Sequence, residues 1–306
     1  MSTSTQPGTT PLHDDRAHGA TMPAAALQAL VGLCKAEGLA PENAVFVADR
    51  GGQLGPATTL PGYVWQDLHG CALALAEGIR TARPELDVFV ITSDAACCGA
   101  GAGHWVHAMR HNLNLTVIVQ GVQAGALSRR PTGANREATT ADEAWAPINP
   151  LSLSLGVPGA SFVAQAVDWI PELLHDTLRA AFQHPGLSLV RVLHRDVQAS
   201  PASFDPWLHD PQRSLLLTHA DALKPSPALS SIYRNQRVHD PADIGLARAV
   251  AAQSDPIPVG ILYRKPVAAP GEAARQAPVL RSPDVIRAGL ARELDRFTVW
   301  PEGGPA

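Results

Sequence analysis

Apolar runs that end at glycine-rich turns alternate with helical segments in the first half of this chain. AVFVAD (44–49) leads to Gly51 and Gly52, and DVFVITSD (87–94) leads into CCGAGAG. A third run, LTVIVQG (115–121), follows a segment of helical periodicity. Strands that are apolar on both sides and separated by helices are typical of a parallel sheet covered on both faces. The pattern therefore predicts an α/β fold whose ligands bind beyond the carboxyl ends of the strands, at the glycine turns.

The remaining periodicity predicts the rest of the domain organisation. We expect helices at 24–37, 68–82, 103–112, 170–184 and 244–253, and strands at 187–194 and 259–264. The strand at 187–194 is expected to be the last of the core, because the chain beyond it is Pro-rich and weakly periodic. Residues 122–150 are interpreted as a long loop over the ligand-binding face. Three regions follow from this pattern: a flexible N-terminal tail (1–22), an α/β domain (23–198) and a C-terminal extension or arm (199–306).

The composition of the chain indicates which kinds of partner and which cellular compartment to expect. A net charge of -4 gives no electrostatic reason to expect nucleic acid or an anionic membrane as partner. We identify no apolar run near the roughly 20 residues that span a bilayer, and no secretory signal at the N-terminus. The four cysteines include no C-x-x-C pair, so we expect no iron–sulfur cluster on this chain. These features predict a reduced, cytoplasmic protein.

Asp94 is the candidate ligand that the residues themselves single out. The turn TSDAACCGAGAG fits neither the G-x-G-x-x-G dinucleotide pattern nor a P-loop. Asp94 comes at the end of a buried strand and faces this glycine-lined turn. It is interpreted either as a ligand of a divalent cation that bridges to a diphosphate, or as the cap of the next helix.

Ordered motifs give the chain a resemblance to a known family. The segments are LPGY (60–63), LHG (68–70), ARP (82–84), SDAA (93–96), HWVHA (104–108), HDP (239–241) and IPVGILYR (257–264). Their order and spacing resemble those of the β subunits of 2-oxoacid:ferredoxin (acceptor) oxidoreductases. The resemblance extends, with gaps, over about residues 24–265.

This resemblance implies a fold, a cofactor and partners. The fold would be the thiamine-diphosphate-binding fold, and the activity the oxidative decarboxylation of a 2-oxoacid. Thiamine diphosphate and Mg²⁺ would be the cofactors, and the thiamine ylid would attack the keto carbon. An α-type subunit would complete the site in a dimeric or hetero-oligomeric complex, with an electron acceptor such as a ferredoxin.

The resemblance also assigns cofactor-binding positions residue by residue. They are Asp49, Gly51 and Gly52 in the first turn, His69 and Gly70, and Ser93, Asp94 and Ala95. Asp94 corresponds to the family's metal-binding aspartate. The resemblance identifies no catalytic residue in this chain.

Several family residues are replaced at the same positions. Gly52 stands in place of the cysteine near the thiazolium ring, and Cys71 in place of an arginine beside the diphosphate. Val122 stands in place of the asparagine that normally completes the metal site. The cysteines that would hold a cluster fall on His18–Met22. Two hypotheses follow: an oxidoreductase β subunit with an altered cofactor site, or a non-catalytic structural or regulatory subunit that no longer binds Mg-thiamine diphosphate.

Other polar and aromatic residues have simpler interpretations. His104, His107 and His111 share one helix, but we identify no carboxylate in the sequence that completes a metal site with them. Arg129 and Arg130 are interpreted as solvated loop residues rather than phosphate ligands. Trp65 and Trp105 are interpreted as aromatic residues of the core or of a subunit contact. Cys97 and Cys98 are interpreted as buried structural thiols.

Overall fold

The structure is a computed structural model of the 306-residue chain. It describes residues 22, 24–49, 60–67, 69–121, 148–194, 204–219, 224–265 and 287. Some predictions fall outside these described residues. They are the predictions on Gly51, Gly52, Val122, Arg129 and Arg130, and on most of the N-terminal tail (1–22) and of the long loop (122–150).

The described residues form one nine-stranded sheet in the order β2-β1-β3-β4-β6-β5-β9-β7-β8. The strands are β1 (Ala44–Asp49), β2 (Tyr63–Asp67), β3 (Asp87–Ser93), β4 (Thr116–Gly121), β5 (Phe162–Val167), β6 (Ser188–Leu193), β7 (Ser214–Thr218), β8 (Gln236–Val238) and β9 (Ile257–Arg264). Strands β2 to β5 in that order pair in parallel. Strand β9 pairs antiparallel with β5 and parallel with β7, which pairs in parallel with β8. The two ends of the sheet therefore run in opposite directions.

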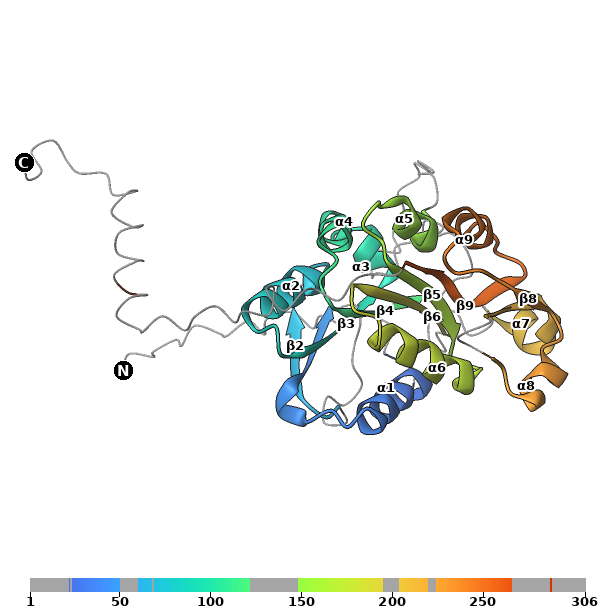
Figure 1. The fold of residues 1–306 in the computed structure, drawn as a ribbon, viewed down its shortest axis with the longest axis horizontal. Coiled ribbons are helices and arrows are strands. Elements are labelled where there is room, and N and C mark those ends of the chain that lie inside the picture. The colour runs from blue at the N-terminus through green and yellow to red at the C-terminus, as the bar shows by residue number, and fades with distance from the viewer. Residues whose placement is uncertain are drawn as a thin grey trace, which may run out of the picture.

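Helices cover both faces of the sheet (Figure 1). The α-helices are α1 (Ala24–Ala36), α2 (Ala72–Ala82), α3 (Asp94–Cys98), α4 (Ala102–His111), α5 (Pro150–Gly156), α6 (Pro171–Phe182), α7 (Asp205–His209), α8 (Pro227–Ile232) and α9 (Ile244–Ala251), with short 3-10 turns at Pro41–Asn43 and Pro211–Arg213. Helices α1 and α6 pack against each other on one face. Helices α2, α4, α5 and α9 lie on the other face. The predicted α/β class, with helices on both faces, is confirmed.

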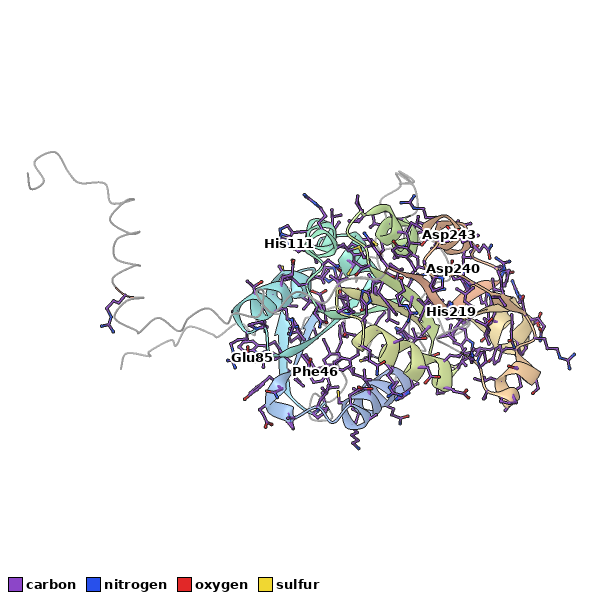
Figure 2. The ribbon with its side chains drawn as sticks, in the orientation of Figure 1. Phe46, Glu85, His111, His219, Asp240 and Asp243 are labelled. Carbon is purple, nitrogen blue, oxygen red and sulfur yellow. The ribbon has the colours of Figure 1, made fainter. Side chains whose placement is uncertain are left out.

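The inner parallel strands are mainly apolar because both of their faces are covered. Every residue of β1, β4, β5 and β6 is buried. On the α1–α6 face, Phe46 and Phe89 stack with ring centroids 5.0 Å apart, and Phe182 stacks on Phe89. Figure 2 shows Phe46 between the sheet and this helical layer. Such burial, at about 25 cal/mol per Å² of apolar surface, is the main favourable term for this layer.

Most predicted elements agree with the structure to within a few residues. The exception is the helix expected from residue 68, which begins at Ala72. Gly70 precedes it with φ of +82°, a left-handed conformation that a helix interior does not accept. Its missing side chain also matters, because a Cβ at Gly70 would lie 2.6 Å from the Gly101 backbone nitrogen. The turns before α2 and α4 are therefore in close contact.

The C-terminal part contributes strands to the same sheet. Strand β9 pairs with β5 inside the sheet, so the expectation that residues 187–194 form the last strand of the core is wrong. A third hydrophobic cluster joins the two parts across Ile170, Leu193, Phe204 and Ile257. The extension predicted for residues 199–306 is thus joined to the α/β domain through its described residues. The domain boundaries themselves stay predictions.

His184 gives the fold a pH-dependent contribution to stability. Its Nε2 lies 2.9 Å from the Ser161 hydroxyl, and its ring packs on Phe162. Burial lowers the pKa of His184 from 6.5 to about 4. A histidine whose folded pKa is depressed favours the folded state above its unfolded pKa, and this contribution is lost as the pH falls.

We expect the free energy of unfolding of the wild-type protein to decrease between about pH 6.5 and pH 4 partly through His184. The variant His184→Gln cannot titrate and should show a smaller decrease over that window in urea unfolding. The exposed His104→Gln serves as the matched control and should follow the wild type. Parallel pH profiles for His184→Gln and the wild type would contradict this role.

Candidate functional site

The carboxyl ends of four parallel strands bring polar residues to one edge of the sheet. Strand β1 ends at Asp49, β3 ends just before Asp94, and β4 ends at Gly121. His194 directly follows β6, and its backbone N–H donates to the Gly121 carbonyl at 2.9 Å. This edge is where parallel α/β sheets bind ligands, so it is the candidate functional site.

Asp94 at this edge forms a buried ion pair with Arg191 of β6. The Arg191 Nη2 donates to Asp94 Oδ2 at 2.6 Å, and Nε lies 3.1 Å from both carboxylate oxygens. The side chain of Arg191 is 0% exposed and that of Asp94 is 4% exposed. The guanidinium therefore contacts both carboxylate oxygens, and charge-assisted contacts of this kind are strong.

Arg191 is held from its other side as well. Its Nη1 donates to Gln165 Oε1 of β5 at 3.2 Å. The Gln165 amide in turn donates to the Pro258 carbonyl of β9 at 2.7 Å. The ion pair thus connects the end of β3 with three further strands through hydrogen bonds.

Gly121 provides the space for this pair. A Cβ at Gly121 would lie 2.9 Å from Asp94 Oδ2 and 3.0 Å from Arg191 Nε. It would also lie 2.9 Å from a side-chain carbon of Leu193. A residue with a side chain at this position would therefore press on both members of the ion pair.

A magnesium ion on Asp94 would compete with Arg191, which donates hydrogen bonds to both carboxylate oxygens. Mg²⁺ requires oxygen ligands at about 2.0–2.1 Å in octahedral geometry. Burial raises the pKa of the Asp94 carboxyl, and the charge and hydrogen bonds of Arg191 oppose that shift. Arg191 supplies the positive charge that a metal would otherwise bring. The alternative interpretation, that Asp94 caps the next helix, differs from the structure, because the Ser93 hydroxyl accepts the bond from the Ala96 N–H.

Asp49, at the same edge, accepts hydrogen bonds from two neighbouring elements of the fold. Its Oδ1 accepts from the Ala72 N–H at 3.2 Å, at the first turn of α2. Its Oδ2 accepts from the Thr92 hydroxyl of β3. A carboxylate at a helix start satisfies an N–H that has no intrahelical partner. Asp49 therefore joins β1, β3 and α2.

The other predicted cofactor positions lie near this edge with different exposures. His69 is exposed in the turn before α2, and Gly70 is buried against the Gly101 turn. Ser93 is half-buried, and Ala95 is exposed on α3. The structure thus brings the described candidates to one edge, and their assignment to a cofactor stays a prediction.

The adjacent thiols of α3 are not activated. Cys97 is buried, and burial raises its pKa well above the usual value. Burial likewise raises the pKa of the Cys98 thiol to about 12. Both groups are therefore thiols rather than nucleophilic thiolates at neutral pH.

The sequence analysis did not identify Arg191, Gln165 or Gln120 as site residues. The sequence does contain an indication for Arg191. It lies inside the apolar run LSLVRVL, and an arginine is rarely buried without a partner. Gln120, next to Gly121, is 3% exposed, and neither of its amide atoms has a hydrogen-bond partner among the residues that the structure describes. Such a group at the carboxyl edge marks a position where a further polar partner fits.

Comparison with known proteins shows which proteins the chain resembles. Residues 46–192 match the family described as thiamine pyrophosphate enzyme, C-terminal TPP binding domain. The matched region contains Asp49, Asp94, Gly121 and Arg191. The thiamine-diphosphate-binding fold predicted from the motifs is thereby confirmed.

Curated proteins similar to the chain come from one group of enzymes. The chain is 36% identical over 176 residues to the 2-oxoglutarate oxidoreductase subunit KorB of Mycobacterium tuberculosis, covering 55% of this chain and 46% of the relative. It is 27% identical over 232 residues to the β subunit of 2-oxoacid:ferredoxin oxidoreductase 2 of Aeropyrum pernix, covering 74% and 72%. The resemblance to β subunits of 2-oxoacid:ferredoxin oxidoreductases is confirmed. The chain spans about half the length of several of the curated relatives that it matches.

A solved structure supports the same fold. The 2-oxoglutarate:ferredoxin oxidoreductase of Magnetococcus marinus superposes with a TM-score of 0.59. The superposition covers 86% of this chain and 88% of that chain at 21% identity. It therefore extends the fold agreement beyond residue 192 into the C-terminal strands.

We predict that Gly121→Ala destabilises the protein by about 1–3 kcal/mol, because the added methyl group overpacks the Asp94–Arg191 pair. The matched control is Gly78→Ala on the exposed side of α2, where a Cβ meets nothing within 4 Å. That change should stabilise the helix by up to about 1 kcal/mol. Urea unfolding measures both, and equal effects of the two substitutions would contradict the steric role of Gly121.

Proposed function

We propose that this chain is the β-type, thiamine-diphosphate-binding subunit of a 2-oxoacid:acceptor oxidoreductase that decarboxylates a 2-oxoacid oxidatively. The observation that carries the proposal is the parallel-strand edge of Asp49, Asp94 and Gly121 inside the family-matched region. The curated relatives of the chain include β subunits of 2-oxoacid:ferredoxin oxidoreductases. Thiamine diphosphate supplies the carbon nucleophile of this class.

The cofactor would lie at this edge without magnesium on Asp94. Support for a ligand at the edge comes from the unpartnered amide of Gln120 and from the contact between the Gly70 and Gly101 turns. The Asp94–Arg191 pair is neutral in sum, and it leaves the diphosphate charge to other groups. In this proposal those groups come from the loops outside the described residues or from a partner subunit.

Electrons would leave through another subunit. A cluster needs several thiolates around one position. Cys34 lies in the hydrophobic cluster on the α1–α6 face, and Cys97 lies in the cluster on the opposite face. These two thiols cannot ligate one cluster, which supports an α-type partner or an external ferredoxin as the route for electrons.

We also propose that the chain is located in the cytoplasm. Within the described ranges, none of the helices combines the length and hydropathy that crossing a bilayer requires. The four cysteines are free thiols. Free thiols are typical of a reducing compartment, and this supports the cytoplasm as the location.

A second function, that of a non-catalytic structural or regulatory subunit, is favoured by one specific observation. The residue that corresponds to the family's metal ligand is buried and paired with Arg191. A chain kept for assembly alone would retain the sheet and lose the metal site. Cofactor binding separates the two functions.

Isothermal titration of the chain co-purified with its α-type subunit tests the proposed activity. We expect saturable binding of one thiamine diphosphate per chain and release of CO₂ from a 2-oxoacid that depends on the added cofactor. A complex that assembles but neither binds the cofactor nor releases CO₂ would reject the catalytic function in favour of the second one.

The same titration gives a prediction about the metal. Because Arg191 covers Asp94, chelating Mg²⁺ should change the affinity for thiamine diphosphate by less than about threefold, or under about 0.7 kcal/mol. An affinity that falls by more than tenfold on chelation would show that a metal acts in the site.

A further inference from the structure

We propose that Glu77, His107 and His111 form a binding site for a divalent transition metal, with Zn²⁺ as the ion that fits best. The three ligand atoms lie within 4.8 Å of one another. The site lies between two helices, away from the strand edge, and the inference does not depend on the proposed function.

The fold brings these residues together from separate helices. His107 and His111 are four residues apart on α4, so they lie on the same side of that helix. Helix α2, which carries Glu77, packs beside α4 (Figure 1). Figure 2 shows His111 at the end of α4, toward the surface. The expectation that no carboxylate completes a site with these histidines is therefore wrong, because the carboxylate comes from a neighbouring helix.

The distances suit a tetrahedral ion. The Nδ1 atoms of His107 and His111 each lie 3.2 Å from a different oxygen of Glu77. The two imidazole rings have centroids 3.9 Å apart. Ligand atoms bound at about 2.0–2.1 Å in tetrahedral geometry are themselves about 3.4 Å apart. Small rotamer changes therefore suffice to direct two nitrogens and one oxygen at a common ion.

The burial of Glu77 gives the site a need for positive charge. The Glu77 side chain is 10% exposed, while those of His107 and His111 are 57% and 54% exposed. The Glu77 Oε1 atom is buried and makes no hydrogen bond with suitable geometry in the structure. A buried carboxylate is costly unless it is paired or binds a metal. A divalent ion satisfies this oxygen and uses both imidazoles as neutral ligands.

The donor set selects the class of ion. Two imidazole nitrogens and one carboxylate oxygen suit Zn²⁺ and its first-row neighbours better than Mg²⁺ or Ca²⁺, which prefer oxygen ligands alone. Since both histidines are exposed, the remaining coordination position faces solvent and would hold water. The ion would also cross-link α2 and α4, whose preceding turns meet at Gly70 and Gly101.

Titration of the full chain with ZnCl₂, after chelator treatment and dialysis, tests this site. We expect one saturable site, weakened by at least about tenfold in Glu77→Gln and in His111→Ala, since even loss of an outer-shell partner costs 10–100-fold. His104→Ala is the matched control, because His104 lies on the same helix but outside the cluster. The affinity of the His104→Ala variant for zinc should equal that of the wild-type protein.

Two further measurements keep the test independent of folding defects. Zinc should raise the melting temperature of the wild type and of His104→Ala, but not that of His111→Ala. Co²⁺ should give the visible absorption of a tetrahedral site in the wild type only when Glu77 is intact. Zinc binding that persists unchanged in both ligand variants would overturn the proposal, as would the lack of a saturable site in the folded wild-type protein.

Discussion

The ion pair between Asp94 and Arg191 is the interaction on which the candidate site depends. It is fully buried, and it connects the end of β3 to β6 and, through Gln165, to β5 and β9. Taking two charges out of water is costly, and the pair is stable only because its geometry and added hydrogen bonds compensate. Gly121 makes this geometry available by leaving the space that a side chain would fill. The protein thus pairs Asp94, the residue that the resemblance assigns to the metal, with a guanidinium.

Much of the fold could be predicted from the periodicity of the sequence. The elements that could not be predicted were missed for physical reasons. The strands at 44–49 and 187–194 were identified because continuous apolar runs beside helices are typical of buried parallel strands. Strand β5 (FVAQAV) and strand β7 (SLLLT) were missed. Short apolar runs of this kind fit a strand and a buried helix segment equally well. The place of β9 in the sheet depends on pairing with β5, a contact between residues about 100 positions apart that local pattern does not reveal.

The candidate site could be located from the sequence, but its chemistry could not. Asp94 was identified from its position after a buried strand and from the family motif. Its partner Arg191 is 97 residues away in the chain, so no local spacing connects them. The same reason applies to Glu77, which is 30 residues from His107 and meets it only because α2 packs on α4. Motifs thus predict where a strand-end site lies, whereas the charge balance of the site depends on contacts that only the folded chain makes.

A double-mutant cycle on Asp94→Asn and Arg191→Met tests the central claim most directly. Each single change leaves one buried charge without the opposite charge beside it, and each should cost about 3–5 kcal/mol in urea unfolding. The double variant removes both charges, so it should be more stable than the sum of the single effects predicts, with a coupling of at least about 2 kcal/mol. Single effects that add to within about 0.5 kcal/mol would show that Asp94 and Arg191 act independently, and would contradict the account.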